Sequence, residues 1–492
     1  MKFTVKDTLT EEEIEKGLSN VIRDGLTSQA MVTMTGGIFL VAFALKLGAS
    51  NTVIGLLAAI PALTQLIQIP SIYLIEKYRV RRAITVYAGA MSRIFLLFIA
   101  LIPFLFTIEA GLAFLIVALS MHTAFAAVGN SSWNPWMRDL VPEDRLGTFY
   151  SKRMSFTIGI GIPLSLIAGF YIDYWKEIFP DYELYGFSIL FFFGFLVGLL
   201  GIYFVSKIPE PRMAPVQGKP KLFNLLLQPF KDVNFKNLIM FLGPWNFAVN
   251  LAAPFFTVYM LKRLQMDLSF IIALGVLSQL TSLAFLRIWG RFSDRFSNKS
   301  VLRVSGPLFM LCILGWTFTT MPEKYILTVP LLIVIHIFMG ISMSAVTLAS
   351  GNIGFKLAPK GSATSYLATN SLVNSLAAGI APILGGGVVD FFTERKLAWT
   401  LTWESSGEKL DIPILNFQQW DFFFFLAFLI GLYSIHRLAM VKEDGSVTGK
   451  IIINEFISET RREIRNFSTI GGLRNMIEFT ISAVKGTQKN KM

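Results

Sequence analysis

Residues 269–299 consist of a long apolar run, SFIIALGVLSQLTSLAFLRIW (269–289), followed by the short hydrophilic segment GRFSDRFSNK (290–299). A transmembrane helix needs about 20 consecutive, mostly apolar residues to cross roughly 30 Å of hydrocarbon. The segment after it is short and rich in charge, as expected of a loop at a membrane surface. This stretch therefore predicts a membrane-spanning helix that ends in a basic turn.

The same pattern recurs along the chain. Besides 269–289, we predict spans at 26–47, 51–75, 83–105, 110–130, 154–174, 187–205, 238–261, 301–320, 326–348, 364–390 and 419–437. The composition agrees, because 53% of the residues are hydrophobic and only 15% are charged, whereas soluble proteins carry about 25% charged residues. The runs are too long for the strands of a membrane barrel. We therefore predict an all-α membrane protein with twelve transmembrane helices.

The distribution of Lys and Arg predicts the orientation. The loops on the side of the N-terminus carry most of the basic residues, as in Lys77, Arg79, Arg81 and Arg82, whereas the opposite loops carry few. Basic loops remain in the cytoplasm. We expect a multi-pass protein of the cell membrane (a plasma membrane or a bacterial inner membrane) with both termini cytoplasmic. The net charge of +12 therefore indicates topology, and we expect no nucleic-acid partner.

Three segments lie outside the predicted spans. Thr10 and Glu13 form a capping box at the start of an amphipathic helix. The tail combines apolar residues at helical spacing with arginines, so it is either an interfacial helix on anionic lipid or a partly ordered soluble tail. We predict an N-terminal amphipathic helix, an N-terminal bundle, a cytoplasmic linker, a C-terminal bundle and a basic cytoplasmic tail, covering residues 1–25, 26–205, 206–237, 238–438 and 439–492.

The two halves of the chain repeat each other. Similar segments surround Phe39 and Phe256, which are 217 positions apart, and Pro142 and Pro359, also 217 apart. Glu76 and Asp294 match at a spacing of 218. A constant offset predicts two pseudo-symmetric six-helix bundles related by an axis along the membrane normal.

These features resemble the major facilitator superfamily. Its signature loop is matched by Gly290, Asp294, Arg295 and Lys299, and the first-half copy is degenerate at Glu76. The loop WNPWMRD (133–139), which includes Arg138 and Asp139, is similar to a poorly characterised bacterial branch. The resemblance implies a carrier that works by alternating access. It also implies that these charged loop residues form a cytoplasmic latch, in which a carboxylate faces a helix N-terminus. The other interpretation is that they only set topology.

The resemblance further implies that the first, fourth, seventh and tenth helices line a central cavity. Polar residues near the middle of these helices and of the eleventh are candidates for substrate binding: His122, His336, Asn246, Asn250, Thr33, Gln29, Asn370 and Asn374, with Trp245 as a wall. Arg93 lies at mid-depth on the third helix, where a structural role is favoured. Each of these residues could instead serve only to join helices.

No Asp or Glu lies in the middle of a predicted span, since Glu76, Asp173, Asp390 and Asp421 all lie at span ends. Intramembrane carboxylates usually mark cation and proton pathways. A cavity with His and Arg but no acid suits a small anionic or polar neutral solute. A His near its ordinary pKa could carry a coupling proton.

We therefore predict a secondary active transporter of a small solute, with the proton as a candidate coupling ion. The alternatives are a lipid or amphiphile flippase or exporter on the same scaffold, and a non-transporting receptor or scaffold. An enzyme is disfavoured, since no nucleophile and base pair or metal cluster is evident, and we expect no cofactor and no metal. The expected partners are the solute and membrane lipid, with the protein acting as a monomer.

Overall fold

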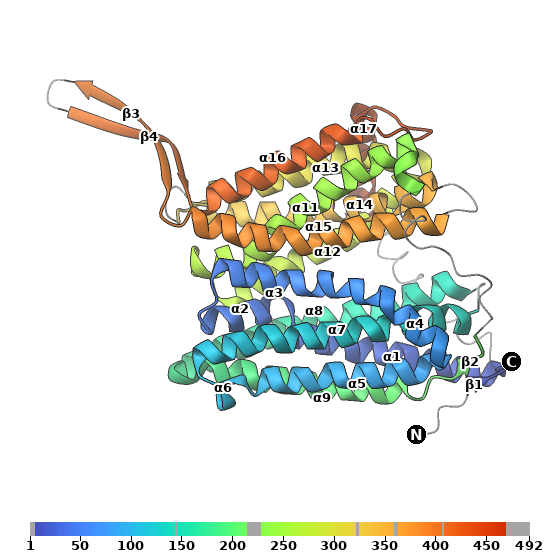
Figure 1. Ribbon diagram of the computed structural model, residues 1–492. Helices are drawn as coiled ribbons and strands as arrows, with labels where there is room; N and C mark the ends of the chain where they lie inside the picture. The colour runs from blue at the N-terminus through green and yellow to red at the C-terminus, as the bar shows by residue number, and fades with distance from the viewer. Residues whose placement is uncertain are drawn as a thin grey trace.

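The computed structural model describes residues 5–142, 145–213, 228–320, 324–358, 363–405 and 408–468 (Figure 1). Within these residues, twelve helical segments are long and apolar enough to cross a membrane. Predicted span 269–289 lies inside a helix from Leu268 to Arg295. The helices extend beyond the apolar runs because the hydrophilic ends of each span stay helical outside the hydrocarbon. The prediction of an all-α protein with twelve spans is confirmed.

The first half contains six spans, several of them broken into shorter helices. Its elements are α1 (Glu11–Thr35), α2 (Gly37–Lys46), α3 (Asn51–Thr64), η1 (Gln65–Ile67), α4 (Gln68–Tyr78), α5 (Arg81–Ala100), α6 (Ile102–Leu105), α7 (Ile108–Leu140), α8 (Leu146–Ile178), η3 (Pro180–Tyr182) and α9 (Glu183–Val205). The capping box at Thr10 and Glu13 is present and begins α1. Gly36 lies between α1 and α2, and Gly37, the first residue of α2, has a φ of 53°, a conformation that glycine adopts readily.

The second half repeats the pattern and adds a hairpin and a terminal helix. Its elements are η4 (Gln228–Lys231), α11 (Val233–Lys262), α12 (Leu268–Arg295), α13 (Asn298–Gly315), η5 (Trp316–Phe318), α14 (Thr328–Leu357), α15 (Ala363–Phe391), β3 (Lys396–Ser405), β4 (Glu408–Gln418), α16 (Trp420–Leu438) and α17 (Gly449–Ser468). Strands β3 and β4 pair antiparallel, and a short parallel pair joins β1 (Val5–Lys6) to β2 (Glu210–Pro211).

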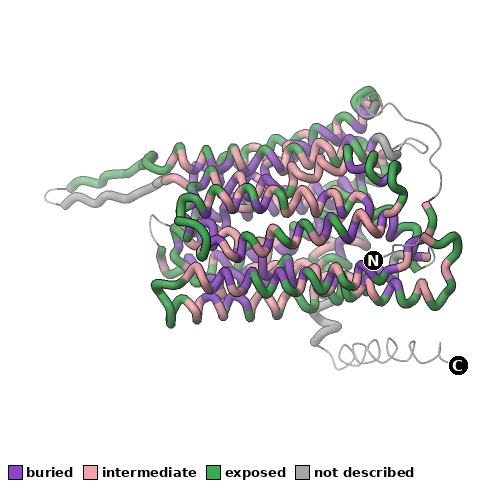
Figure 2. The backbone as a smooth tube through the Cα atoms, turned by 60° about the horizontal axis from the view of Figure 1, so that its bottom comes forward, coloured by how far each residue is buried: buried purple, intermediate pink, exposed green. Residues whose placement is uncertain are grey.

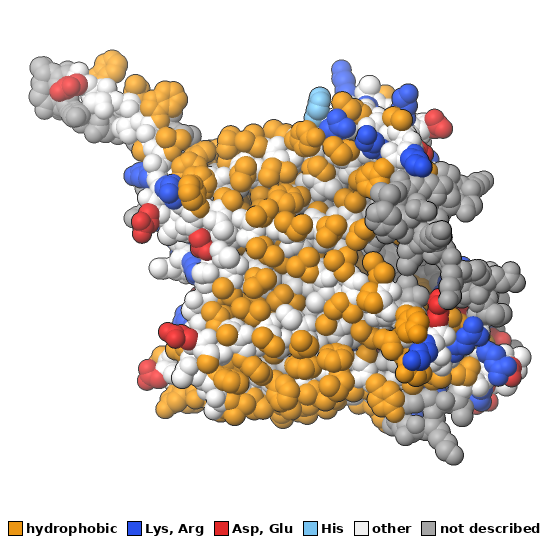
Figure 3. All heavy atoms as spheres, in the orientation of Figure 1, with side chains coloured by type: hydrophobic (Ala, Val, Ile, Leu, Met, Phe, Trp, Pro, Cys, Tyr) orange, Lys and Arg blue, Asp and Glu red, His pale blue; other side chains and the backbone are white. Residues whose placement is uncertain are grey.

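The spans lie roughly parallel in two bundles, one for each half of the chain (Figure 1). We name the two ends of the molecule by their landmarks. The β3–β4 hairpin projects from the hairpin face, and α1 begins and α17 lies at the terminal face. Hydrophobic side chains cover the lateral surface between these ends, whereas Lys and Arg gather mainly at the terminal face (Figure 3). Buried residues concentrate along the inner sides of the helices (Figure 2).

Aromatic side chains pack the interior of the second half. Phe256 stacks on Trp316 at 4.5 Å between ring centroids and on Phe424 at 5.5 Å, and Tyr259 meets both Trp316 and Phe424 edge to face. Lipid is as apolar as these rings, so close packing rather than exclusion of water holds such helices together. The prominence of Phe in the sequence therefore reflects interhelical packing as well as lipid contact.

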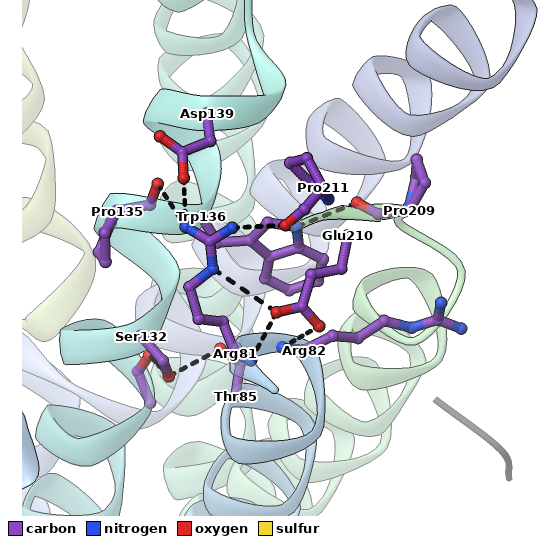
Figure 4. A network of polar contacts seen from close by, with 11 residues as sticks. Arg81, Arg82, Thr85, Ser132, Pro135, Trp136, Asp139, Pro209, Glu210 and Pro211 are labelled. Atoms are coloured by element: carbon purple, nitrogen blue, oxygen red, sulfur yellow. Dashed lines mark hydrogen bonds and ion pairs between the residues drawn. The ribbon is translucent and has the colours of Figure 1, made fainter. Parts of the chain in front are cut away.

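A buried carboxylate at the terminal face ties each bundle together. Glu210 accepts hydrogen bonds from the backbone N–H groups of Arg81 at 2.6 Å and Arg82 at 3.1 Å, at the start of α5 (Figure 4). The Arg81 guanidinium, with its side chain 1% exposed, pairs with Asp139 and donates to the Pro211 carbonyl at 2.8 Å. This network anchors the segment after α9 to α5 and α7.

The second bundle has an equivalent tie. Glu443, which follows α16, accepts from the backbone N–H groups of Asn298 at 3.2 Å and Lys299 at 2.7 Å, at the start of α13. Residues 298 and 299 lie 217 positions after 81 and 82. The sequence offset therefore corresponds to equivalent places in the two bundles.

The tail forms α17, which docks on the second bundle. Phe456 stacks on Trp289 at 4.7 Å and on Phe285 at 5.6 Å, and Ile452 is fully buried. The apolar stripe predicted for the tail thus covers α12 and α13 at least in part. Residues 469–492 of the predicted tail, and most of the predicted linker (214–227), lie outside the described residues.

Candidate functional site: a cavity closed at the hairpin face

Glycines allow α3 and α15 to approach closely near the hairpin face. A Cβ atom built on Gly55 would lie 2.0 Å from the carbonyl oxygen of Pro382, and one on Gly386 would lie 2.3 Å from the carbonyl oxygen of Asn51. Neither neighbour is a flexible side chain that could move aside. Only glycine permits this contact between the two halves.

Asp390, at the end of α15, caps the start of α3 in the other half. Its carboxylate accepts from Asn51 Nδ2 at 2.8 Å, from the backbone N–H of Thr52 at 2.9 Å and from Thr52 Oγ1 at 2.7 Å. The first N–H groups of a helix lack partners within the helix and carry partial positive charge, so a carboxylate there is favourable. The contact bridges the two bundles.

Asp173, near the end of α8, makes the equivalent contact with the two halves exchanged, because it lies in the first half and caps a helix of the second. It accepts from the backbone N–H groups of Leu268 at 3.2 Å and Ser269 at 2.8 Å, at the start of α12. Asp390 lies 217 positions after Asp173, and 268 and 269 lie 217 after 51 and 52. We call these two contacts the carboxylate caps. They are related by the internal repeat and close the hairpin face.

The terminal face lacks this closure among the described helices. Toward the terminal face, the span that begins with α3 continues as α4, which packs on α7 and α5 of its own half. The helix pairs that join the halves most closely are α3 with α15 and α8 with α12. The space between the bundles therefore opens toward the terminal face.

Three connected pockets line this space. A polar pocket of about 280 Å³ lies within the first bundle, a middle pocket of about 290 Å³ lies between α1, α8 and α12, and an apolar pocket of about 490 Å³ lies against the second bundle. Val32 lines both the polar and the middle pocket, and Ile158 and Gln279 line both the middle and the apolar pocket. The three are parts of one cavity.

The polar pocket holds Asp24 and Arg153. Asp24 is 6% exposed, accepts from Ser28 Oγ at 3.1 Å and lies 3.9 Å from Arg153 Nη2. Arg153 crosses α1 closely, because a Cβ atom on Gly25 would lie 2.8 Å from its Nε. A carboxylate and a guanidinium thus face each other in the cavity with only a long ion-pair distance between them.

Arg93 supplies a second cation to the same pocket. Its Nη1 donates to the Gly89 carbonyl at 3.4 Å, and its buried Nε has no hydrogen-bond partner in the described part of the chain. Burying an ionised group without full pairing is costly. With Arg93 and Arg153 set against Asp24, the pocket carries one positive charge that its own residues leave unbalanced.

His122 is the fourth titratable group of the pocket. Its Nδ1 lies 2.8 Å from the Ser92 carbonyl oxygen, and Ser92 Oγ donates to the His122 carbonyl at 2.9 Å. A carbonyl only accepts, so the network places a proton on Nδ1. His122 thereby joins α5 to α7 and lines the pocket.

Of the other predicted site residues, Gln29 and Thr33 lie in the cavity. Both line the middle pocket, and Gln29 Nε2 donates to Thr33 Oγ1 at 3.2 Å. Helix α1 therefore presents a polar face along the cavity, from Asp24 in the polar pocket to Thr33 in the middle one.

The predicted residues of the second half lie mainly in helix packing. Asn246 Nδ2 donates to Asn374 Oδ1 at 2.9 Å, which joins α11 to α15, and Asn250 donates to the Asn246 carbonyl at 2.7 Å. Trp245 is buried between Phe241 and Phe309. The contact between Asn246 and Asn374 is an interhelical joint, the alternative considered for these residues, whereas the bond of Asn250 lies within α11.

The remaining two residues of this group are placed similarly. His336 is buried, donates from Nδ1 to the Leu332 carbonyl at 2.8 Å and packs against Trp316. Asn370 lies beside Gly354, where α15 meets α14. Neither lines the three pockets, so among the histidines only His122 reaches the cavity.

The predicted latch residues make contacts within their own halves. Asp139 pairs with Arg81, Arg295 lies 3.4 Å from Glu455 of α17, and Lys299 Nζ donates to the Ala439 carbonyl at 3.1 Å. Three others are exposed, namely Glu76, Asp294 and Arg138, and Gly290 lies in open space. With the terminal face open, a latch between the halves at this end stays a prediction.

Sequence reasoning missed Asp24 and Arg153. Both lie just before the apolar runs that begin at 26 and 154, so the absence of a mid-span carboxylate led to a cavity without acid. The helices α1 and α8 begin earlier, at Glu11 and Leu146, and carry these side chains inward. The helical spacing of Asp24 and Ser28, four residues apart on one face, is the signal that could have found the acid.

The sequence profile of the Major Facilitator Superfamily matches residues 25–382 and 246–435. The chain belongs to the major facilitator superfamily. Three solved structures of similar fold are the nucleoside transporter NupG (13% identity, covering 86% of this chain and 100% of that one, TM-score 0.60), a D-xylose-proton symporter (13%, 89% and 99%, 0.62) and a bacterial homolog of the human lysosomal transporter Spinster (14%, 88% and 95%, 0.55). No curated protein sequence matches.

At such low identity, these likenesses support the fold alone, and they agree with a multi-pass membrane transporter. Among the described residues, no three His, Cys, Asp or Glu side chains gather in a way that could hold a metal ion.

Proposed function

We propose that this protein is a secondary active transporter that moves a small anionic or polar neutral solute by alternating access. The observation that carries the proposal is the polar pocket, in which Arg93 and Arg153 face the single carboxylate of Asp24. A bound anion would supply the charge that the pocket lacks and the hydrogen-bond acceptors that the guanidinium groups require.

The proposal includes an orientation. The basic terminal face is cytoplasmic under the positive-inside rule, so the hairpin face is outside and the cavity opens inward. Breaking the carboxylate caps and closing the terminal face would give the outward-open state. The fold that this chain shares with a nucleoside transporter and a D-xylose-proton symporter is compatible with this movement. We expect a monomer in the cell membrane.

A proton is the coupling ion we propose, and Asp24 is its site. An anion that binds Arg153 competes with Asp24 for the same guanidinium, 3.9 Å away. Displaced from its partner in a site of low dielectric, the carboxylate gains from taking up a proton. Solute and proton would then enter the site together. His122, which lines the same pocket, would act by hydrogen bonding.

Transport in liposomes tests the solute class. Counterflow should be measured for a panel of organic anions, polar neutral solutes and cations. Arg153→Gln removes a charge-assisted hydrogen bond that contributes about 1.5–3 kcal/mol, so anion uptake should fall about 10- to 100-fold. Arg212→Gln is the matched control, because Arg212 is exposed and pairs with Asp7 outside the cavity. If cations are taken up in preference to anions, the electrostatic basis of the proposal is wrong.

The coupling step has its own test. A pH gradient alone should drive solute uptake against a concentration gradient in the parent protein. Asp24→Asn should abolish this uptake and retain counterflow, because exchange needs no net proton movement. Retention of gradient-driven uptake in that variant would exclude Asp24 as the coupling site.

A further inference from the structure

Around the cavity, residues at equivalent positions in the two halves differ in polarity. The offset of 217 relates Gly89 of α5 to Gly306 of α13, as it relates the carboxylate caps. Applied to the polar pocket, the offset pairs three of the four titratable residues with apolar ones, namely Asp24 with Phe241, Arg93 with Met310, and His122 with Met339. The fourth, Arg153, is paired with the neutral amide of Asn370. The charged and titratable groups of the polar pocket therefore have no charged or titratable counterpart in the second half.

The second half has an apolar pocket instead. Its wall includes Phe256 of α11, Leu283 and Leu286 of α12, and Met339 and Met343 of α14. These side chains come from three helices of the second bundle, and α8 of the first bundle closes the side with Met154 and Ile158. At about 490 Å³, this pocket lies within the range of about 300–1,000 Å³ typical of sites for drug-sized ligands.

Two of the four hydroxyl groups in this wall donate to backbone carbonyls. Ser278 Oγ donates to the His336 carbonyl at 2.7 Å, and Ser344 Oγ donates to the Ile341 carbonyl at 2.9 Å. Their donor capacity is thus used within the bundle. The pocket therefore offers a ligand mainly hydrocarbon, ring and thioether surface, with Gln279, Ser282 and Thr347 as its further polar side chains.

We infer that the cavity binds an amphiphilic anion, with its charged group in the polar pocket and its apolar part in the apolar pocket. The assignment rests on the proposed function and narrows its solute class. A purely polar solute would leave the large apolar wall facing water, and a neutral hydrophobe would leave the excess charge of Arg93 and Arg153 unbalanced. Only a ligand with both parts satisfies the two ends of the connected cavity.

The geometry also fixes how the ligand lies. The middle pocket joins the other two through Val32 on one side and through Ile158 and Gln279 on the other. The ligand therefore crosses from the first bundle to the second. Its head contacts α1, α5 and α8, and its tail contacts α11, α12 and α14. A ligand that spans both bundles can sense their relative movement.

Chain-length dependence of binding is the test. Monoalkyl phosphates with two, six and ten carbons, and the corresponding alcohols, should be added to the full-length protein in phosphatidylcholine nanodiscs. Binding is measured as thermal stabilisation, with ligand concentrations corrected for partition into empty nanodiscs. We expect affinity for phosphates to rise with chain length, by at most about fourfold per methylene, and to exceed that of the matching alcohols.

Two variants separate the head from the tail. Arg153→Gln should lower the affinity for every phosphate by a similar factor, about tenfold, and Arg153→Lys should recover part of it. Leu286→Ser should lower the affinity for decyl phosphate about fivefold or more and leave ethyl phosphate unchanged. Leu280→Ser is the matched control on the same helix, because Leu280 is exposed and lies outside the pocket wall. It should change neither affinity.

Three results would overturn the inference. They are equal affinities for ethyl and decyl phosphate after correction, equal affinities for phosphates and alcohols, and a Leu286→Ser variant that binds every chain length as the parent does. Counterflow of short hydrophilic anions without any preference for chain length would reject the amphiphile and retain the transporter. Conversely, binding with the predicted pattern but without counterflow would retain the amphiphile site and reject transport.

Such an anion could come from water or from the bilayer, and a second arm distinguishes these sources. Replacing part of the phosphatidylcholine with phosphatidylglycerol should weaken the apparent affinity for decyl phosphate if bilayer phospholipids occupy the site. It should leave that affinity unchanged if the site takes only single-chain amphiphiles from water. In either case the effect of phosphatidylglycerol should be absent in Arg153→Gln.

Discussion

Removing the charge of one carboxylate cap should open the hairpin face. Asp390 accepts three hydrogen bonds from Asn51 and Thr52, and Asp173 accepts two from Leu268 and Ser269. In the outward-open state these carboxylates would face water, so the caps stabilise only the closed hairpin face. The substitutions Asp390→Asn and Asp173→Asn therefore shift the equilibrium between states without removing a contact from the outward-open form.

The size of the expected shift depends on which hydrogen bonds the substituted asparagine can still accept. Its side-chain oxygen can still accept one or two hydrogen bonds, but the charge is lost. Hydrogen bonds to charged groups contribute about 1.5–3 kcal/mol against about 0.5–1.5 for neutral ones, and the helix terminus adds about 0.3–1 kcal/mol. We expect each variant to lose about 1–2 kcal/mol, a shift of about 5- to 30-fold toward the outward-open state. The two caps share no partner, so their effects should add in the double variant.

Spin labels on the hairpin face would measure this shift. Cys312 is the only cysteine and is buried, so a Cys312→Ala background carries no competing label. Labels at exposed Glu177 and Glu394 report the distance between the first and the second bundle at this face. A population at longer distance should appear in each single variant and dominate in the double variant.

The control is Asp181→Asn, since Asp181 is an exposed acid at the same face, outside the caps. It should leave the distances as in the parent. If both cap variants give the parent's distance distribution while remaining folded, the carboxylate caps do not hold the hairpin face closed.

Two further outcomes are expected. Gly55→Ala places a Cβ atom about where the α15 backbone lies, so it should block closure and favour the outward-open state in the same distance measurement. Gly159→Ala, where nothing lies within 4 Å, should not. Glu210→Gln removes one of the two carboxylates that pair with the buried Arg81 guanidinium, the one at 3.5 Å, while Asp139 remains. It should destabilise the protein by about 1.5–3 kcal/mol, seen as a lower thermal midpoint than that of exposed Glu12→Gln.

The spans could be predicted because lipid imposes one strong requirement. Every backbone polar group in hydrocarbon must be paired, so each long apolar run must be a helix. The ends of the helices were harder to predict from the sequence, because the membrane surface does not terminate a helix that continues into water. Because the predicted spans began too late, Asp24 and Arg153 were placed outside them. The prediction therefore omitted these two charged groups of the cavity.

The candidate site was harder to predict because a polar residue in a membrane has two possible uses. Asn246 and Asn374 join helices, whereas Gln29 and Thr33 line the cavity, and the four residues look alike in sequence. Depth along a span is readable from the sequence, but the direction of a side chain around the helix depends on how the helices pack. The internal repeat was readable, yet its most informative pair, Asp173 and Asp390, became apparent only when each was found capping a helix of the other half.

The repeat explains why the closing contacts are symmetric while the cavity is not. Both bundles must move against each other about one axis, so each half needs the same kind of contact to the other, and Asp173 and Asp390 supply it. A ligand that lies across the axis has no such symmetry. One bundle can therefore keep Arg93 for the head of the ligand while the other places Met310 at the equivalent position. The repeat therefore holds at the contacts that close the hairpin face and fails at Asp24, Arg93 and His122 of the polar pocket.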